Sequence, residues 1–286
     1  MKTEKIDLYD FFHIPRSKNC GGVLTSYILT PSKEIKAKMR PSILIFPGGG
    51  YQYISDREGE PVAMRFVEAG YNAFVLNYSV SVPHPIPLQE AYMAMAYVRE
   101  RVAVGDFERN HIVALGFSAG GHLAGMLGIS PFYADLGIRI KKKEQDCRPN
   151  AVILSYPVIS MKDGITHNNS RTVICGGDEA LYNELSLEKV VGQYSAPAFI
   201  WHTFEDICVP MENSLRLAEA YRKEQIPFSL HIFEKGGHGL SLCNTETNNQ
   251  TEVDKRLSYI GKWVELALDW LTARGFVVET SSEDQK

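Results

Sequence analysis

The chain has 286 residues, of which 44% are apolar and 22% are charged, the composition of an ordinary globular protein. Its formal net charge of −4 argues against nucleic acid or a membrane surface as a partner. The first residues lack the apolar core of a signal peptide, and no window approaches the roughly 18 apolar residues of a membrane span. The five cysteines are scattered without Cys-x-x-Cys spacing, which indicates reduced thiols. We therefore expect a cytoplasmic protein.

The first half of the chain alternates strand patterns with helix patterns. In order, it predicts a strand at 22–30, a strand at 42–46, a helix at 60–69, a strand at 72–78, an extended loop at 79–87 and a helix at 88–102. Residues 22–30 alternate apolar with polar side chains, as in a half-exposed antiparallel strand, whereas 42–46 is almost continuously apolar, as in a strand buried on both faces. Ser55, Asp56 and Glu58 offer capping chemistry for the helix that follows them.

The second half continues the alternation. In order, it predicts a strand at 111–115, a helix directly after residue 118, strands at 151–156 and 198–202, a helix at 212–224, a strand at 228–233 and a long amphipathic helix at 252–273. Residues 157–196, with short helices around 178–190, interrupt this order, and a gap of this length in a compact domain is usually functional. We interpret it as a lid or cap, beside a smaller excursion at 130–148 and a frayed tail at 280–286.

Apolar strands that alternate with helices imply an α/β fold with a mostly parallel central sheet and helices on both faces. The sequence contains no internal repeat. We expect residues 1–286 to form a single domain.

A glycine-flanked serine at 116–122, Gly-Phe-Ser-Ala-Gly-Gly-His, lies between a strand pattern and a helix pattern. This arrangement is typical of a nucleophile elbow. Glycine is expected at positions 116 and 120, because the residues two before and two after the serine approach so closely that a Cβ would clash. The strained turn is expected to expose Ser118 Oγ above the sheet edge, at the N-terminus of a helix. Ser118 is therefore the predicted nucleophile.

A serine hydroxyl needs a general base, normally a histidine that a carboxylate holds in one tautomer. His238 lies on a glycine-rich loop after the last predicted strand, where it can project over the carboxyl edge of the sheet, and is the predicted base. Asp206, in the pattern Asp-x-x-Val-Pro after the preceding strand, is the predicted acid. Glu205 is its nearest rival, and more remote rivals are Asp178 and Glu179.

Three other histidines are weaker candidates. His122 lies one turn into the elbow helix and points away from the serine, so we expect it to pack in the core. His84 lies in a proline-rich loop and can line a pocket, whereas His167 has no motif around it.

Attack on an acyl carbon creates an oxyanion, and losing one preorganised donor for it costs about 10²–10³ in rate. The N–H of Ala119, the residue after the nucleophile, is the first expected donor. The glycine loop at 48–50 follows a buried strand and can turn its N–H groups inward with no side chain in the way. This loop is expected to supply the other donors.

Taken together, these motifs resemble the α/β-hydrolase superfamily, and within it the bacterial acetylesterase and acetyl-xylan-esterase-like proteins, which are related to the hormone-sensitive-lipase-like esterases. The similarity covers nearly the whole chain and rests on segments 47–51, 77–87, 116–122, 201–214 and 236–240. The order of Ser118, Asp206 and His238 is also that of the superfamily.

The resemblance implies that Gly49 and Gly50 join Ala119 in the oxyanion hole. One departure is plain: Pro47 stands where hormone-sensitive-lipase-like enzymes have a histidine that orients this loop. The acetylesterase branch therefore fits better.

The resemblance implies a serine carboxylic-ester hydrolase that releases short acyl groups, chiefly acetyl, with no metal and no cofactor. Its expected partner is a small-molecule ester such as an acetylated oligosaccharide, and a homo-oligomer stays open. Aromatic side chains can stack on a sugar ring, and the candidates for lining the cleft are Tyr51, Tyr53, His84, Trp201 and Phe204.

Two alternatives stay open. The first is amide cleavage, by an arylformamidase or by a small peptidase similar to the prolyl-oligopeptidase catalytic domain, whose large propeller has no room before the first buried strand. The second is a non-catalytic binding protein on a hydrolase scaffold. Such proteins lose the catalytic histidine, whereas His238 is present here.

Overall fold

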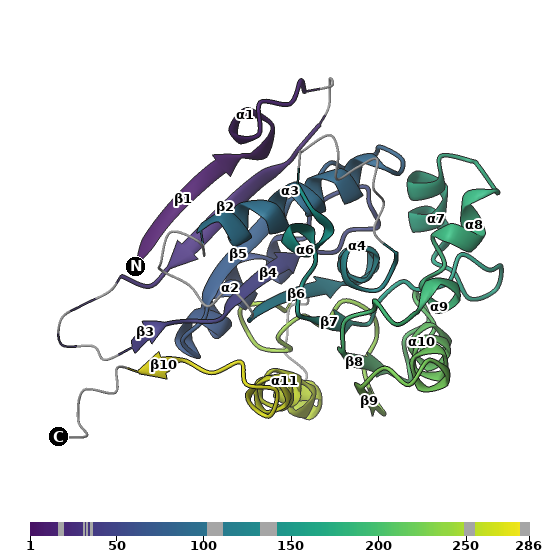
Figure 1. The fold of residues 1–286 in the computed structure, drawn as a ribbon. Coiled ribbons are helices and arrows are strands. Elements are labelled where there is room, and N and C mark those ends of the chain that lie inside the picture. The colour runs from purple at the N-terminus through teal and green to yellow at the C-terminus, as the bar shows by residue number, and fades with distance from the viewer. Residues whose placement is uncertain are drawn as a thin grey trace.

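The computed structural model describes residues 1–16, 20–30, 32, 34, 37–101, 111–131, 142–248 and 255–280. Its centre is a sheet of eight strands in the order β1-β2-β5-β4-β6-β7-β8-β9 (Figure 1). These strands are β1 (Lys2–Asp7), β2 (Val23–Ile28), β4 (Ser42–Phe46), β5 (Asn72–Asn77), β6 (Ile112–Phe117), β7 (Ala151–Ser155), β8 (Ala198–Thr203) and β9 (Phe228–Phe233). A separate antiparallel pair joins β3 (Ala37–Met39) to β10 (Glu279–Thr280).

From β5 to β9 across the sheet, neighbouring strands run parallel, whereas β1 and β2 are antiparallel additions at one edge. In β4, β6, β7 and β8 every residue is buried, as expected for strands covered on both faces. Because the parallel strands all point the same way, the loops that follow them meet at one edge of the sheet. Glycine-rich and acidic loops from distant parts of the sequence thereby become neighbours.

Helices cover both faces of this sheet (Figure 1). They are α1 (Leu8–Phe11), α2 (Glu60–Glu68), α3 (Ile86–Arg101), α4 (Ala119–Gly128), α6 (Glu144–Cys147), α7 (Asn168–Cys175), α8 (Leu181–Glu184), α9 (Leu187–Val190), α10 (Glu212–Lys223) and α11 (Trp263–Thr272), with 3-10 helices η1 (Asp56–Glu58) and η3 (Lys255–Lys262). One core packs against α3, α4 and α10, and the other packs against α2 and α11. The predicted α/β architecture is confirmed. Along the described ranges, no helix combines the length and the apolar character needed to cross a bilayer.

The structure differs from the sequence predictions at both ends of the chain. Strand β1 was not expected, because this partly exposed edge strand carries charged residues and no apolar run. The C-terminal helix predicted at 252–273 is a 3-10 helix over Lys255–Lys262 that becomes α-helical only from Trp263. Residues 132–141 of the smaller predicted excursion and 281–286 of the predicted tail lie outside the described residues.

The long segment between β7 and β8 contains α7, α8 and α9. Asn213 of α10 is completely buried and holds this segment in place. Its Oδ1 accepts the N–H groups of Ile159 and Ser160, each at 3.0 Å, and its Nδ2 donates to the carbonyls of Ile165 and Pro210, each at 2.9 Å. One side chain therefore ties the segment to the loop that follows β8.

Candidate active site

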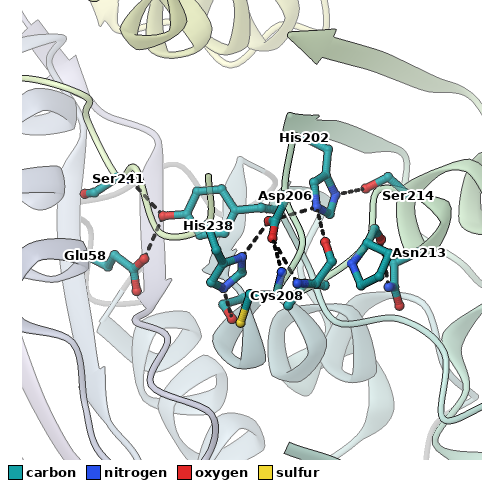
Figure 2. Close-up of polar contacts among 12 residues, drawn as sticks. Glu58, His202, Asp206, Cys208, Asn213, Ser214, His238 and Ser241 are labelled. Atoms are coloured by element: carbon teal, nitrogen blue, oxygen red, sulfur yellow. Dashed lines mark hydrogen bonds and ion pairs between the residues drawn. The ribbon is translucent and has the colours of Figure 1, made fainter. Parts of the chain in front are cut away.

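Three side chains from separate loops meet at the carboxyl edge of the sheet. Ser118 follows β6, Asp206 follows β8 and His238 follows β9. His238 Nε2 lies 2.7 Å from Ser118 Oγ, and His238 Nδ1 lies 2.6 Å from Asp206 Oδ2. Figure 2 shows the imidazole of His238 directed at the Asp206 carboxylate. The structure thus brings the three residues singled out in the sequence into one hydrogen-bonded chain.

The turn between β6 and α4 holds the serine in a strained backbone conformation. Ser118 has φ 53° and ψ −118°. A Cβ on Gly116 would lie 2.1 Å from the carbonyl oxygen of Gly120, as the elbow predicts, but a Cβ on Gly120 would meet the carbonyl of Phe46 in β4, also at 2.1 Å. The second glycine is therefore required by the neighbouring strand. Ser118 is only 6% exposed as a whole residue, and it lines a cavity.

Asp206 is buried and has its carboxylate fully engaged. Its Oδ1 accepts the N–H groups of Cys208, at 3.0 Å, and Val209, at 2.9 Å. Burial raises the pKa of this carboxyl, but hydrogen bonds from His202 and His238 outweigh the burial and hold the pKa well below its usual range. Asp206 is therefore ionised at neutral pH, the state that stabilises an imidazolium.

The rival carboxylates face elsewhere. Glu205 is exposed, forms an ion pair with Lys235 at 3.0 Å and accepts the N–H of Gly236. Asp178 and Glu179 are exposed on the loop after α7. The carboxylate contact to the imidazole belongs to Asp206.

The loop after β4 turns its backbone toward the same cavity. Gly49 and Gly50 have φ values of 123° and 64°, and a Cβ on Gly49 would lie 2.0 Å from the carbonyl oxygen of Tyr53. Ala119 begins α4, whose N-terminus favours negative charge. Among the described residues, the amide groups of Gly49, Gly50 and Ala119 have no hydrogen-bond acceptor. These three N–H groups are the ones that the sequence predicts as oxyanion donors.

A cavity of about 340 Å³ lies over the serine. Its walls come from the segments that follow β4, β6, β7, β8 and β9, and comprise Gly49, Gly50, Gln52, Tyr53, Ser55, Arg57, Glu58, Ser118, His167, Asn169, Cys208, His238 and Gly239. Of the five side chains expected to line the cleft, Tyr53 is among these walls and is 62% exposed.

Tyr51 and Trp201 are instead completely buried, and the expectation that they line the cleft is corrected. The hydroxyl of Tyr51 lies 2.8 Å from Nδ1 of His122, which is buried as expected. Trp201 donates its indole N–H to Ser155 Oγ at 2.7 Å and stacks on Trp263. Both aromatic side chains serve packing.

His84 and Phe204 also lie away from the cavity walls. The imidazole of His84 is 3.8 Å from the carboxylate of Glu184, at the end of α8. Phe204 is 64% exposed after β8. The loop that carries Asp206 thus directs Cys208, and not its aromatic residue, toward the serine.

Three residues that contact Asp206 or line the cavity were not predicted as site residues from the sequence. His202 is completely buried at the end of β8, four residues before Asp206, a spacing that was visible in the sequence. His167 lines the cavity, and burial together with the nearby His238 lowers its pKa, which keeps it neutral at pH 7. Glu58 lines the cavity although it is only 3% exposed. The last two had no motif to mark them.

Comparison with known proteins identifies the family. Residues 28–221 match the family model BD-FAE. The chain belongs to the BD-FAE family. The match runs from the end of β2 to α10 and so includes Ser118 and Asp206, whereas His238 follows it.

Curated relatives of this BD-FAE chain include two larger proteins. The chain is 40% identical over 223 residues to endo-1,4-beta-xylanase B of Butyrivibrio fibrisolvens, a match that covers 72% of this chain and 33% of that protein. It is 30% identical over 239 residues to an acetylxylan esterase of Xylanibacter ruminicola, which covers 78% of this chain and 45% of that protein. The chain therefore spans between a third and a half of the length of these relatives.

Solved structures similar to the BD-FAE chain are closer to its own size. An acetyl ester-xyloside bifunctional hydrolase of Caldicellulosiruptor lactoaceticus superposes with a TM-score of 0.75 at 37% identity and 89% coverage of both chains. A carboxylesterase of Lactobacillus plantarum superposes with a TM-score of 0.80 at 28% identity, covering 98% of this chain and all of that one. The resemblance to α/β-hydrolase esterases is thus confirmed.

Proposed function

We propose that this BD-FAE protein is a serine carboxylic-ester hydrolase that releases short acyl groups, chiefly acetyl, from a carbohydrate ester. The observation that carries the proposal is the contact chain from Asp206 through His238 to Ser118, beside three amides that have no acceptor among the described residues. The esterase names of its relatives and structural neighbours support the same reaction class.

The first half-reaction acylates the serine. His238 Nε2 takes the hydroxyl proton while Ser118 Oγ bonds to the acyl carbon, and the carbonyl electron pair becomes the oxyanion. The amides of Gly49, Gly50 and Ala119 donate to that oxygen. When the intermediate collapses, the bond to the alcohol oxygen breaks and the imidazolium gives its proton to the leaving alcohol.

The second half-reaction reverses the roles. A water molecule gives its proton to His238 and attacks the acyl carbon, and the proton then returns to Ser118 as the acid leaves. Asp206, ionised throughout, stabilises the imidazolium in both halves. Apart from the ester and the water, every group in this scheme belongs to the chain itself.

An acetylated xylo-oligosaccharide is the proposed substrate class. Two relatives support it by name, since one is an acetylxylan esterase and one structural neighbour is an acetyl ester-xyloside hydrolase. The cavity of about 340 Å³ leaves room beside the serine for the sugar as well as the acyl group. A reducing compartment remains part of the proposal, since none of the five cysteines forms a disulfide.

Purified protein incubated with 4-nitrophenyl acetate and with acetylated xylo-oligosaccharide tests the proposal. We expect turnover of both, and loss of both in Ser118→Ala. Release of acetate from neither substrate would end the proposal. Hydrolysis of N-formylkynurenine in place of the two esters would favour the arylformamidase alternative.

A further inference from the structure

The peptide bond that leads into the glycine loop is held at both of its polar atoms. Tyr78 donates its hydroxyl to the carbonyl of Pro47 at 2.7 Å, and Glu58 Oε2 accepts the N–H of Gly48 at 2.8 Å. Both side chains are buried, so water does not compete for these bonds. Holding this planar peptide anchors the start of the loop that carries the next two amides, those of Gly49 and Gly50.

The second carboxylate oxygen of Glu58 reaches the histidine side of the site. Tyr156 donates its hydroxyl to Glu58 Oε1 at 2.6 Å and accepts the N–H of Ser241 at 2.9 Å. Figure 2 shows Glu58 and Ser241 on the same side of His238. The ring of Tyr156 meets His238 edge-on, with 5.0 Å between the ring centroids.

A second link, made of two hydrogen bonds from side chains to backbone carbonyls, runs alongside this one. Arg57 Nη1 donates to the carbonyl of Gly239 at 2.9 Å, and Ser241 Oγ donates to the carbonyl of Arg57 at 2.6 Å. The residue before Glu58 is therefore fastened to the residues on the C-terminal side of His238. The glycine loop and the histidine loop form one hydrogen-bonded unit.

In this link Glu58 accepts two hydrogen bonds, and the phenol of Tyr156 donates one of them. Burial, and then the carboxylate of Glu58, raise the pKa of Tyr156 well above its ordinary value, so the phenol keeps its proton and donates it. Both carboxylate oxygens of Glu58 already accept hydrogen bonds. This occupancy argues against Glu58 as a second acid or base, although it lines the cavity.

We propose that Glu58 is a positioning residue that fixes the amides of the glycine loop toward the oxyanion and couples that loop to His238. The inference rests on the proposed esterase function, because the oxyanion exists only in that reaction. A group that orients oxyanion donors acts on the transition state and leaves substrate binding unchanged, so its loss lowers kcat and not KM.

The expected fall in kcat depends on the contacts that still hold the glycine loop in the variant. Loss of a whole oxyanion donor costs about 10²–10³ in rate. In Glu58→Gln the loop is still held by Tyr78 and by the bond from Ser55 N–H to the carbonyl of Gly48, so we expect kcat to fall by about 10- to 100-fold. Tyr156→Phe removes the side-chain part of the coupling to the histidine loop and leaves the bonds of Arg57 to Gly239 and Ser241, so a smaller fall in kcat is expected.

The chain offers a matched control in Glu90. This carboxylate is also completely buried, and it also accepts a tyrosine hydroxyl, that of Tyr9 at 2.8 Å, and a backbone N–H, that of Ser79. It belongs to α3, outside the cavity walls. Glu90→Gln therefore repeats the chemical change of Glu58→Gln at a site that holds no oxyanion donor.

The experiment measures kcat and KM for 4-nitrophenyl acetate and the inhibition constant of phenylboronic acid, whose tetrahedral adduct on Ser118 places a hydroxyl at the oxyanion position. We expect Glu58→Gln to lose kcat and boronate affinity by similar factors at unchanged KM, with Glu90→Gln within about twofold of the wild type in all three. Wild-type turnover that Ser118→Ala abolishes is required first, and its absence would count against the proposed function alone.

Given an active wild type, a kcat within twofold of it in Glu58→Gln overturns the inference, as does an equal loss in Glu90→Gln. A loss that appears in KM instead of kcat also overturns it, because it would indicate a substrate contact. If Glu58→Gln does not fold, as judged by circular dichroism and thermal unfolding, Tyr156→Phe decides. An unchanged kcat and boronate affinity in that variant would then refute the coupling.

Discussion

His202 Nε2 lies 3.3 Å from Asp206 Oδ2, the same carboxylate oxygen that contacts His238 Nδ1 at 2.6 Å (Figure 2). The carbonyl of Val209, 2.8 Å from His202 Nε2, can only accept, so Nε2 carries a proton, and Nδ1 lies 2.8 Å from Ser214 Oγ. The side chains of His202 and Asp206 are both fully buried. The imidazole of His202 thus contacts the carboxylate of Asp206 in addition to the imidazole of His238.

Removing that contact should weaken catalysis. We expect His202→Leu to lower kcat for 4-nitrophenyl acetate by about tenfold, at the lower end of what a hydrogen bond to a charged group contributes. His202→Gln, whose amide can occupy the place of Nε2, should recover part of the loss. His231→Leu, at a histidine of the edge strand β9, is the matched control and should retain the wild-type kcat. Equal kcat values in all four proteins would refute this role.

The assignment of the acid can be tested with adjacent residues. Asp206→Asn should lower kcat by about 10³–10⁴, because the amide no longer holds the tautomer or stabilises the imidazolium. Glu205→Gln removes an exposed carboxylate paired with Lys235 and should stay within about threefold of the wild type. An active Asp206→Asn beside an inactive Glu205→Gln would show that the acid was misassigned. Kinetics with 4-nitrophenyl acetate at one pH suffice.

Buried His122 should make the fold sensitive to acid. Burial lowers its pKa to about 4, against a weaker opposing effect of its bond to the carbonyl of Leu185. Since an unfolded histidine has a pKa of about 6.5, the unfolded state binds more protons in this window, and stability is lost as the pH falls from about 6.5 toward 4. Between pH 7 and pH 5 the group should account for about 2 kcal/mol of the loss in unfolding free energy.

Urea unfolding of the wild type and of His122→Gln at the two pH values measures this contribution. The variant should lose less stability between pH 7 and pH 5 than the wild type, whatever its stability at pH 7. His13→Gln, at an exposed histidine, is the control and should follow the wild type. Identical pH dependence in the three proteins would assign the acid sensitivity elsewhere.

Gly120 should tolerate no side chain. A Cβ there would lie 2.1 Å from the carbonyl of Phe46 and 2.3 Å from that of Pro47, both backbone atoms that cannot move aside. We expect Gly120→Ala to destabilise the protein by about 3 kcal/mol or more, in the range of overpacked cores. Gly237→Ala adds a methyl where no atom lies within 4 Å and should change stability by about 0.5 kcal/mol at most. Comparable urea midpoints for the two variants would contradict the geometry.

The parts of the site that could be predicted are those marked by a short motif in the sequence. An apolar strand followed by glycines around Ser118, or around His238, states both where the loop lies and why its backbone needs glycine. The parallel sheet then brings these loops together without further information. Asp206 could be placed in the same way because it follows β8, the strand before the one that leads to His238.

The remaining parts of the site depend on the direction in which a side chain points. Neighbouring residues in the sequence do not determine this direction. Tyr51 adjoins the glycine loop, yet its ring turns into the core to meet His122. Glu58 was expected to help cap α2, but the cap residue is Gly59 without any side-chain bond, and the carboxylate turns inward to Gly48. Its partners lie on loops after β4 and β7, so only the folded chain reveals the contact.

The anchoring of the β7–β8 segment by Asn213 affects how substrate arrives. His167 and Asn169 of that segment form one wall of the cavity, and the segment is fastened to the same loop that carries the acid. Such a wall favours a permanently open cleft over a hinged cover. Hydrolysis would then begin without a lag and without interfacial activation, and dissolved esters would be accepted as readily as aggregated ones.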